Sequence, residues 1–184
     1  AAKKRHVQGL RDEAEHLSKV YGYDQLLFVD STEMGWMTQA QGMHGALLDQ
    51  GARHLHPLKY AYGLAKAADL LGADIHEGSE VLGYTDNDGA QVQVRTASGS
   101  VKARFLVLAC NGYLGHLEPR IAGNIMPINN FILATEPLSK EQQAAVTRDN
   151  FSLSDTLYVI NYWKLSADGR LLFGGGENYS SRFP

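Results

Sequence analysis

Two short stretches have the composition of places where a polypeptide backbone lies close to a ligand. The first is Gly174-Gly175-Gly176, at the end of an apolar run. Glycine has no Cβ, so a flat ring or a neighbouring strand can lie directly against its main chain. A phosphate-binding loop would lead into a helix, and residues 177–184 have no helical pattern. We therefore predict close approach of a ring or a strand at residues 174–176.

The second stretch is Cys110-Asn111-Gly112, which follows the unbroken apolar run of residues 105–109. Such a run is typical of a strand buried on both faces of a parallel sheet. In open α/β sheets, ligands bind beyond the carboxyl ends of these strands. Cys110 has the chemistry of a nucleophile, but no His or acid lies at a supporting spacing. We interpret it as a small thiol that lines a site.

Three aromatic residues, Tyr158, Tyr162 and Trp163, are expected on one strand. Such residues either stack on a substrate or cofactor, or pack in a core as β-favouring side chains. Strand alternation puts the two tyrosines on one face and Trp163 on the other. We predict that the tyrosines line a substrate site and that Trp163 packs in the core.

Metal binding has little support. His54 and His56 stand two apart, so on a strand both rings would face the same side, as metal ligands can. No third or fourth ligand is near in the sequence, and we interpret His56 as the start of the segment that leads into a helix at Pro57. The Asp86–Gly89 segment resembles a calcium loop, but the later bidentate acid is missing and alternating segments flank it. A hairpin turn is predicted there.

Hydrophobic periodicity predicts the elements that position these residues, and they form a mixed α/β set. In the first part we expect a helix at 3–21 stopped by Gly22, a strand at 26–29, helical turns at 31–39 capped by Ser31, strands at 45–49 and 52–55 around Gln50-Gly51, and a helix from Pro57 to Gly72. In the second part we expect a strand at 73–76, a meander of 81–85, 91–96 and 101–104, the parallel strand at 105–109, a strand at 131–135, a helix capped by Ser139 with Gln142, and a hairpin of 157–163 with 170–174.

Composition limits the classes of function. The chain has 184 residues, 44% of them hydrophobic, and a net charge of −3 with both signs scattered along it. The basic surface of a nucleic-acid-binding protein is therefore not expected. A single cysteine excludes an internal disulfide and favours a reducing, cytoplasmic setting. No apolar run approaches the roughly 20 residues that span a bilayer, so membrane insertion is not predicted.

Five motifs, in this order, resemble a known family. They are HLHPLKY at 54–60, IHEGSEV at 75–81, VLACNGY at 107–113, MPINNFILATE at 126–136 and LLFGGGE at 171–177. Together they are similar to the D-amino-acid-oxidase-like superfamily of FAD-dependent oxidoreductases, and most of all to its γ-glutamylputrescine oxidoreductase group. The combination covers nearly the whole chain and is far more specific than any single motif.

The resemblance implies a Rossmann-like FAD-binding domain interleaved with a mixed-sheet substrate domain. Residues 1–55 and 113–184 would then belong to the substrate domain, and residues 56–112 to the FAD-binding domain. The positions implied to lie near FAD are Val81, Ala109, Cys110, Asn111, Gly112, Gly174, Gly175 and Gly176. Tyr158 and Tyr162 are implied to line the amine site.

The chemistry implied by the resemblance is oxidation of an amine C–N bond to an imine by hydride transfer to FAD, with oxygen reoxidising the flavin. Two alternatives stay open. One is an amino-acid oxidase, which would clamp a carboxylate with an arginine such as Arg170 or Arg182. The other is a non-catalytic α/β binding module.

The resemblance also implies that the chain is an internal fragment. The family's GxGxxG motif would precede Ala1, and its C-terminal flavin-contacting segment would follow Pro184. These missing segments would be the fragment's partners, besides a small-molecule amine. Without them we expect the fragment itself to be inactive.

Overall fold

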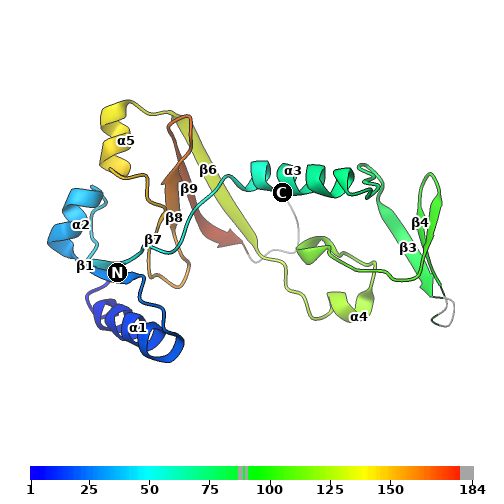
Figure 1. Cartoon of the computed structure of the whole chain (residues 1–184), viewed down its shortest axis with the longest axis horizontal. Helices are drawn as coiled ribbons and strands as arrows, with labels where there is room; N and C mark the ends of the chain where they lie inside the picture. The colour runs from blue at the N-terminus through cyan, green and yellow to red at the C-terminus, as the bar shows by residue number, and fades with distance from the viewer. Residues whose placement is uncertain (87–88, 90, 179–184) are drawn as a thin grey trace. The chain divides into compact units, whose positions relative to one another are not determined.

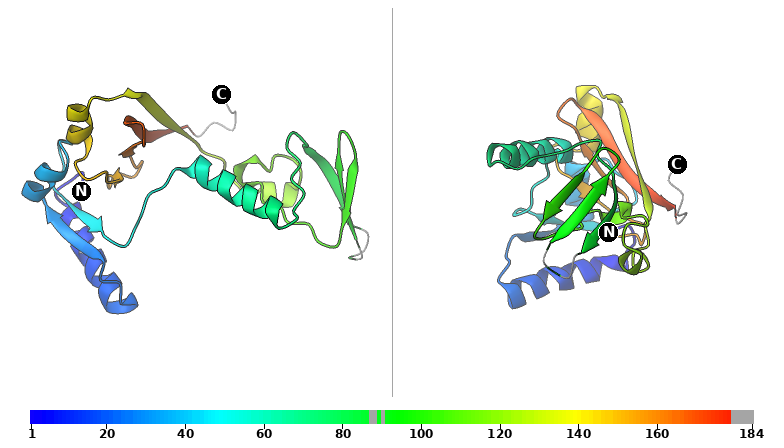
Figure 2. Two further views of the ribbon diagram at one scale, coloured as in Figure 1. Left: turned by 45° about the horizontal axis from the view of Figure 1, so that its top comes forward. Right: turned by 90° about the vertical axis from the view of Figure 1, so that its right-hand side faces the viewer.

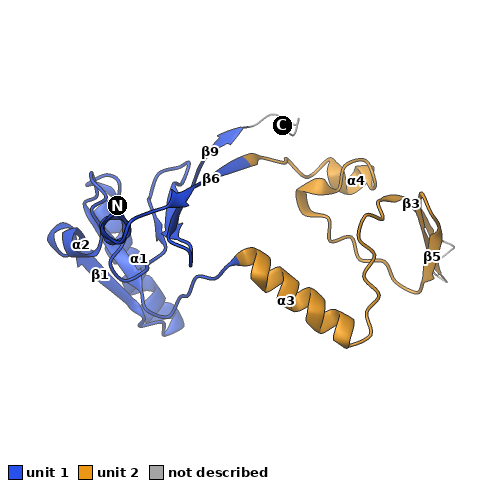
Figure 3. Ribbon diagram, turned by 90° about the horizontal axis from the view of Figure 1, so that it is seen from above, with its two compact units in different colours: residues 1–56, 130–178 blue, residues 57–129, 179–184 orange. Residues whose placement is uncertain are grey.

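A computed structural model describes residues 1–86, 89 and 91–178. The chain divides into two compact units (Figure 3). Unit 1 consists of residues 1–56 together with 130–178, and unit 2 of residues 57–129. The chain therefore leaves unit 1 after residue 56 and returns to it at residue 130. Residues 113–129 fall in unit 2.

The N-terminal part of unit 1 is a helix beside a two-stranded sheet (Figure 1). Helix α1 spans His6–Tyr21 and ends at Gly22, whose φ of 64° is left-handed. Two backbone hydrogen bonds, Gly22 N–H to Ser18 O and Tyr23 N–H to Leu17 O, close this end. Strands β1 (Leu26–Asp30) and β2 (Gly45–Asp49) pair antiparallel. The predicted helix, its glycine stop and the strand at 26–29 are confirmed.

Helix α2 spans Ser31–Met37, but Ser31 is not its cap. The Asp30 carboxylate accepts the N–H groups of Thr32 and Glu33 at 2.8 and 2.9 Å. The Glu33 carboxylate in turn accepts the Asp30 N–H at 3.0 Å. Asp30 and Glu33 thus form a capping box, in which each side chain satisfies a backbone donor at the helix start. The prediction of Ser31 as cap was wrong by one residue.

The strand predicted at 52–55 is absent, because β2 pairs with β1 instead. The Asp49 carboxylate accepts the N–H groups of Gly51 and Ala52 at 2.9 and 3.1 Å. Bonds from a side chain to the next backbone donors make a turn rather than a hairpin strand. Residues 52–56 then run without regular structure to the end of this segment of unit 1.

The second sheet of unit 1 has four strands in the order β6-β9-β8-β7. Its elements are β6 (Asn129–Pro137), α5 (Lys140–Val146), β7 (Leu153–Ser154), β8 (Tyr162–Leu165) and β9 (Arg170–Asn178). The capping box of Ser139 and Gln142 is confirmed. So is the hairpin of β8 and β9, although β8 begins only at Tyr162. Residues 157–161, predicted as strand, form a loop because the Asp155 carboxylate accepts the N–H groups of Leu157 and Asn161.

The two parts of unit 1 meet at the ends of α2 and α5. The Thr38 hydroxyl donates to Val146 O at 2.7 Å, and backbone bonds run from Gln39 N–H to Ala145 O and from Arg148 N–H to Met37 O. Val29, Met34, Thr38 and Thr147 are among the buried residues here. This junction positions the β1–β2 layer against the second sheet.

Unit 2 contains helix α3 and an antiparallel meander. Helix α3 spans Pro57–Leu70, and proline at its first position confirms the prediction. Strands β3 (Val81–Asp86), β4 (Val92–Thr96) and β5 (Ser100–Ala103) lie side by side in that order (Figure 2). A 3₁₀ turn at Asn111–Tyr113 and α4 (Pro119–Ala122) follow. The meander is confirmed, while its predicted turn at 86–89 includes residues 87 and 88, outside the described part.

Two predicted strands of unit 2 are not formed. Residues 73–76 and 105–109 have no strand structure. Phe105 is 82% exposed and Val107 is 83% exposed. A parallel strand is buried only when neighbouring strands and covering helices lie on both of its sides. Within the described residues no strand pairs with 105–109, so the apolar run stays exposed.

Candidate functional site

The glycine-rich end of β9 lies beside the start of β8. Tyr162 and Gly174 are paired residues of these two antiparallel strands. A Cβ built on Gly174 would fall far inside van der Waals contact with the ring atoms Cε2 and Cζ of Tyr162. Glycine at this position therefore lets a tyrosine ring lie against the backbone. The flat ring expected from the sequence is supplied at Gly174 by the chain itself.

The next two glycines differ from each other. A Cβ on Gly175 would lie 2.5 Å from the Asn161 side-chain oxygen, so glycine at 175 leaves room for the Asn161 side chain. Gly176 has a left-handed φ of 71°, and a Cβ there would meet nothing within 4 Å. Backbone conformation requires glycine at 176, and the space beside it is open. Of the three, Gly176 offers the most accessible backbone.

A short hydrogen-bond chain holds this end of the sheet. The Tyr162 hydroxyl donates to the Asn130 side-chain oxygen at 2.5 Å, and the Asn130 amide donates to Gly176 O at 3.3 Å. Tyr162, Asn130 and Gly176 come from three adjacent strands, β8, β6 and β9. The phenol that was predicted to line a substrate site is thus held by Asn130, which in turn bonds to the glycine-rich end of β9.

Tyr158 does not share a strand face with Tyr162, contrary to the prediction. It lies in the loop before β8 and is 96% exposed. Alternation applies only within a strand, and Asp155 ends the extended run before Tyr158 is reached. Trp163 is half-buried: its ring stacks on Phe173 with centroids 6.1 Å apart, and it also lines a cavity of unit 1.

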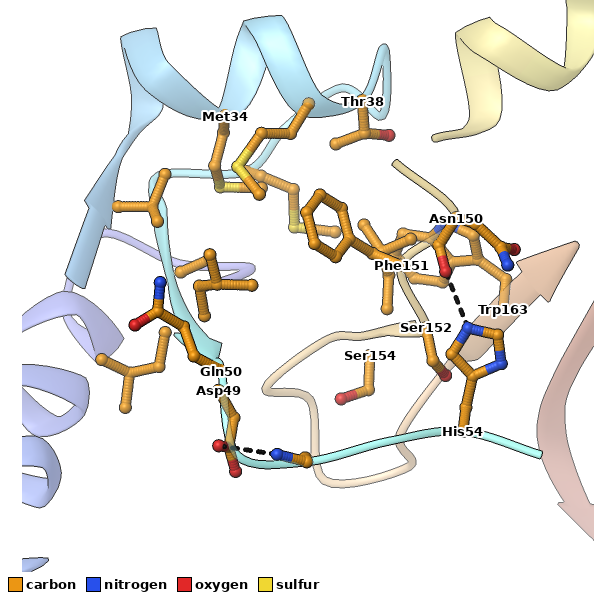
Figure 4. A pocket seen from close by; sticks show the side chains of 18 of the residues that line it. Met34, Thr38, Asp49, Gln50, His54, Asn150, Phe151, Ser152, Ser154 and Trp163 are labelled. Carbon is orange, nitrogen blue, oxygen red and sulfur yellow. Dashed lines mark hydrogen bonds between the residues drawn. The ribbon is translucent and has the colours of Figure 1, made fainter. Parts of the chain in front are cut away.

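Unit 1 also contains a cavity of about 900 Å³ (Figure 4). It opens between the β1–β2 layer and the segment that leads into β7, and its lining is mostly apolar, with Met34, Met37, Met43 and Phe151 among the contributors. On one side the His54 ring is hydrogen-bonded to Asn150 O, at 2.7 Å from Nε2. The lining comes from segments far apart in sequence, so no local pattern could have indicated it.

Unit 2 holds the other predicted site residues. Val81 begins β3, where a β-bulge interrupts the pairing with β4. Ala109 and Asn111 are exposed, while Cys110 and Gly112 are half-buried. Asn111 has a left-handed φ of 49°, a conformation that Asn tolerates better than most residues. That Ala109, Cys110, Asn111 and Gly112 approach a cofactor stays a prediction.

In unit 2 a side-chain hydrogen bond joins β3 to α4. The Tyr84 hydroxyl donates to the Glu118 carboxylate at 2.6 Å, and Glu118 also caps α4 by accepting the Arg120 N–H. The hydrogen bond to Glu118 raises the pKa of Tyr84, and the bond from Tyr84 lowers the pKa of Glu118.

Among the described residues, no group of three or more His, Cys, Asp or Glu side chains could hold a metal ion. No described helix is long and apolar enough to cross a membrane.

Comparison with known proteins identifies the family. The FAD dependent oxidoreductase family matches residues 1–184, and the chain belongs to it. The predicted FAD-dependent oxidoreductase class is thereby confirmed.

Named relatives are similar over most of this chain. It is 38% identical over 174 residues to "Probable oxidoreductase OrdL" of Rhizobium meliloti, which covers 95% of this chain and 40% of the relative. It is 37% identical over 165 residues to "Gamma-glutamylputrescine oxidoreductase" of Escherichia coli, which covers 89% of this chain and 38% of the relative. The chain therefore spans about two fifths of the length of the curated relatives it matches.

Solved structures share the fold. The L-proline dehydrogenase from P. horikoshii superposes with a TM-score of 0.75 at 18% identity, covering 96% of this chain and 47% of that one. The glycine oxidase from Bacillus cereus superposes with a TM-score of 0.69 at 16% identity, covering 97% of this chain and 47% of that one. The mixed α/β class predicted from the sequence is confirmed.

Proposed function

We propose that the protein containing this chain oxidises the C–N bond of an amine to an imine, and that its substrate resembles γ-glutamylputrescine. The observation that carries this proposal is the 37% identity to "Gamma-glutamylputrescine oxidoreductase" over 89% of this chain. In the reaction the substrate carbon loses a hydride and the nitrogen loses a proton. Water then hydrolyses the imine. Bound FAD supplies the hydride acceptor.

Each unit contributes residues that we propose to hold FAD. In unit 2 they are Val81 and the segment of Ala109, Cys110, Asn111 and Gly112, where the exposed backbone and the left-handed Asn111 leave room for a ligand. In unit 1 they are Gly174, Gly175 and Gly176, of which Gly176 has open space beside its Cα. We assign residues 56–112 to the FAD-binding domain and residues 1–55 and 113–184 to the substrate domain.

The amine site is assigned to Tyr158 and Tyr162. The Tyr162 hydroxyl donates to Asn130, so its oxygen keeps acceptor capacity that suits an amine N–H. Because the phenol is already held in one orientation, binding a ligand to it loses less side-chain entropy than binding to a mobile phenol. Tyr162 would orient the substrate, while the hydride transfer itself belongs to the flavin.

An amino-acid oxidase is the second candidate, because the chain is also 30% identical over 131 residues to "Glycine oxidase" of Bacillus subtilis. That activity needs a cation for the substrate carboxylate. Arg170 is already engaged, donating to the Asp168 carboxylate at 2.8 Å and to Thr135 O at 2.9 Å. Arg182 lies outside the described residues.

The test is anaerobic reduction of the full-length protein. Purified protein with bound flavin is yellow, and a substrate bleaches it. We expect γ-glutamylputrescine to bleach the flavin faster than putrescine, glycine or sarcosine at equal concentration. Preferential bleaching by glycine would replace the amine proposal with the amino-acid one. A full-length protein without any bound flavin would overturn both.

A further inference from the structure

The loop before β8 is closed by one carboxylate. Asp155 is only 8% exposed. Its Oδ1 accepts the N–H groups of Leu157 and Asn161 at 3.0 and 3.2 Å, and its Oδ2 accepts the Asn161 side-chain amide at 2.7 Å. The Asp155 N–H also donates to Asn161 O at 2.9 Å. Three hydrogen bonds therefore join residues 155 and 161 around the base of the loop, and with the bond from Leu157 N–H the carboxylate accepts three in all.

A second set of contacts fixes the same base from outside. The Thr156 hydroxyl oxygen accepts the Ala2 N–H at 3.1 Å and is hydrogen-bonded to the His6 ring, 2.6 Å from Nδ1. On the other side, the Asn161 side-chain oxygen lies against Gly175 of β9. The base of the loop is thus attached both to the start of α1 and to the glycine-rich strand end.

The tip of the loop has the opposite character. Tyr158 is 96% exposed, whereas Asp155 at the base is 8% exposed. An aromatic side chain on a fixed loop is a low-entropy contact for a ligand, because its main chain is ordered before binding. Tyr162, the residue that follows the loop and begins β8, is itself held by its hydrogen bond to Asn130.

We propose that Asp155 is a positioning residue that fixes the 155–161 loop and thereby presents Tyr158 to the amine substrate. The proposal rests on the proposed function. Asp155 acts through Tyr158 and not on the reacting atoms. A buried acceptor with three amide donors is costly to remove, because the part-buried N–H groups of Leu157 and Asn161 would lose their partner. Asp155→Asn retains an oxygen for the two backbone donors, but its NH₂ group opposes the Asn161 amide.

The kinetic test uses the full-length flavoprotein and a double-mutant cycle. We expect Asp155→Ala and Tyr158→Ala each to raise KM for γ-glutamylputrescine about tenfold with a smaller change in kcat, and the double variant to be no worse than either single one. Asp155→Asn should lie between wild type and Asp155→Ala. Effects on KM that multiply in the double variant would overturn the proposal, as would a Tyr158→Ala variant with unchanged KM.

Asp168→Ala is the matched control. Asp168 also organises a turn of the same sheet by accepting from Ser166 and Arg170, but its turn carries no tyrosine. If Asp168→Ala raised KM as much as Asp155→Ala, general destabilisation would explain the result and the positioning role would fall.

Hydrogen exchange separates this proposal from the proposed function. Asp155→Ala should accelerate exchange of the Leu157 and Asn161 amides while exchange within β8 stays unchanged. Unchanged exchange at both amides would overturn the role of Asp155 whatever the substrate is. If no amine reduces the wild-type flavin, the proposed function fails, and with it the role of Tyr158 toward an amine.

Discussion

The ring of Tyr162 lies against the backbone of Gly174, its paired residue on the adjacent strand, with no room for a Cβ between them. The same Tyr162 carries the hydroxyl that donates to Asn130. One glycine thus determines where a proposed substrate-lining phenol lies.

Gly174→Ala should displace the Tyr162 ring and break its bond to Asn130. Overpacking of this kind costs about 1–3 kcal/mol, and we expect lower thermal stability together with a raised KM for the amine. Gly99→Ala is the control, because a Cβ at Gly99 meets nothing within 4 Å and the backbone there is not left-handed. Thermal unfolding of the full-length variants measures the difference, and equal stability of the two variants would contradict the packing argument.

Asp30→Ala should destabilise the protein by about 1 kcal/mol through loss of the α2 cap. Ser31→Ala should leave stability nearly unchanged, because the Asp30 carboxylate, not the Ser31 hydroxyl, accepts the N–H groups of Thr32 and Glu33. Denaturant unfolding compares the two variants. A larger loss for Ser31→Ala would restore the cap predicted from the sequence.

Gly9 and Gly22 separate the effect of a glycine inside helix α1 from that of the glycine that ends it. A Cβ meets nothing within 4 Å at either Gly9 or Gly22, but only Gly22 is left-handed. Gly9→Ala, inside α1, should stabilise by about 0.5–1 kcal/mol, while Gly22→Ala should destabilise by about 1 kcal/mol. Opposite shifts in Tm are expected. Shifts of the same sign would mean that contacts, rather than backbone conformation, decide both positions.

The Tyr84–Glu118 bond predicts a pH dependence. Its contribution through Glu118, whose pKa is lowered from 4.5, is present above pH 4.5 and is lost as pH falls through the lowered value. Its contribution through Tyr84, whose pKa is raised from 10.0, is present below pH 10 and is lost as pH rises through the raised value. Tyr84→Phe should therefore lower Tm at pH 7, and the deficit should shrink toward both extremes.

Tyr62→Phe is the control for that experiment, since Tyr62 is an exposed tyrosine on α3 in the same unit. Its Tm should stay close to that of the wild type measured in the same buffers. A pH-independent deficit for Tyr84→Phe would indicate that the bond to Glu118 contributes nothing.

Local chemistry made much of the fold predictable. The Gly22 stop, proline at the first position of α3, and the Ser139–Gln142 capping box each follow from a few adjacent residues, and the structure confirms all three. The alternating residues of β4 likewise needed only their own pattern and two turns. Such features do not depend on which distant segment packs against them.

Features that depend on distant partners were less predictable. Residues 52–55 have the composition of a strand, but β2 is already paired with β1, and the choice between these partners is made in three dimensions. The run at 105–109 has the composition of a buried strand without a paired neighbour among the described residues. Within the candidate site, the glycine run was found, whereas Asn130 and Asp155 were not. Their roles arise from bonds to other segments, and polar residues in loops carry no periodic signal.

Unit 1 is assembled from two segments separated by the whole of unit 2. Thr38 bonds to Val146 across 108 positions, and Ala2 to Thr156 across 154. At roughly 5–20 residues per second on the ribosome, the first segment waits on the order of 5–20 s before its partners are synthesised. During that interval Val29 and Met34 lack the later segment around Phe151 that lines the same cavity. The nascent chain is thus most open to chaperone capture and misassembly while unit 2 is being made. Slower synthesis of unit 2 should therefore reduce the yield of folded protein.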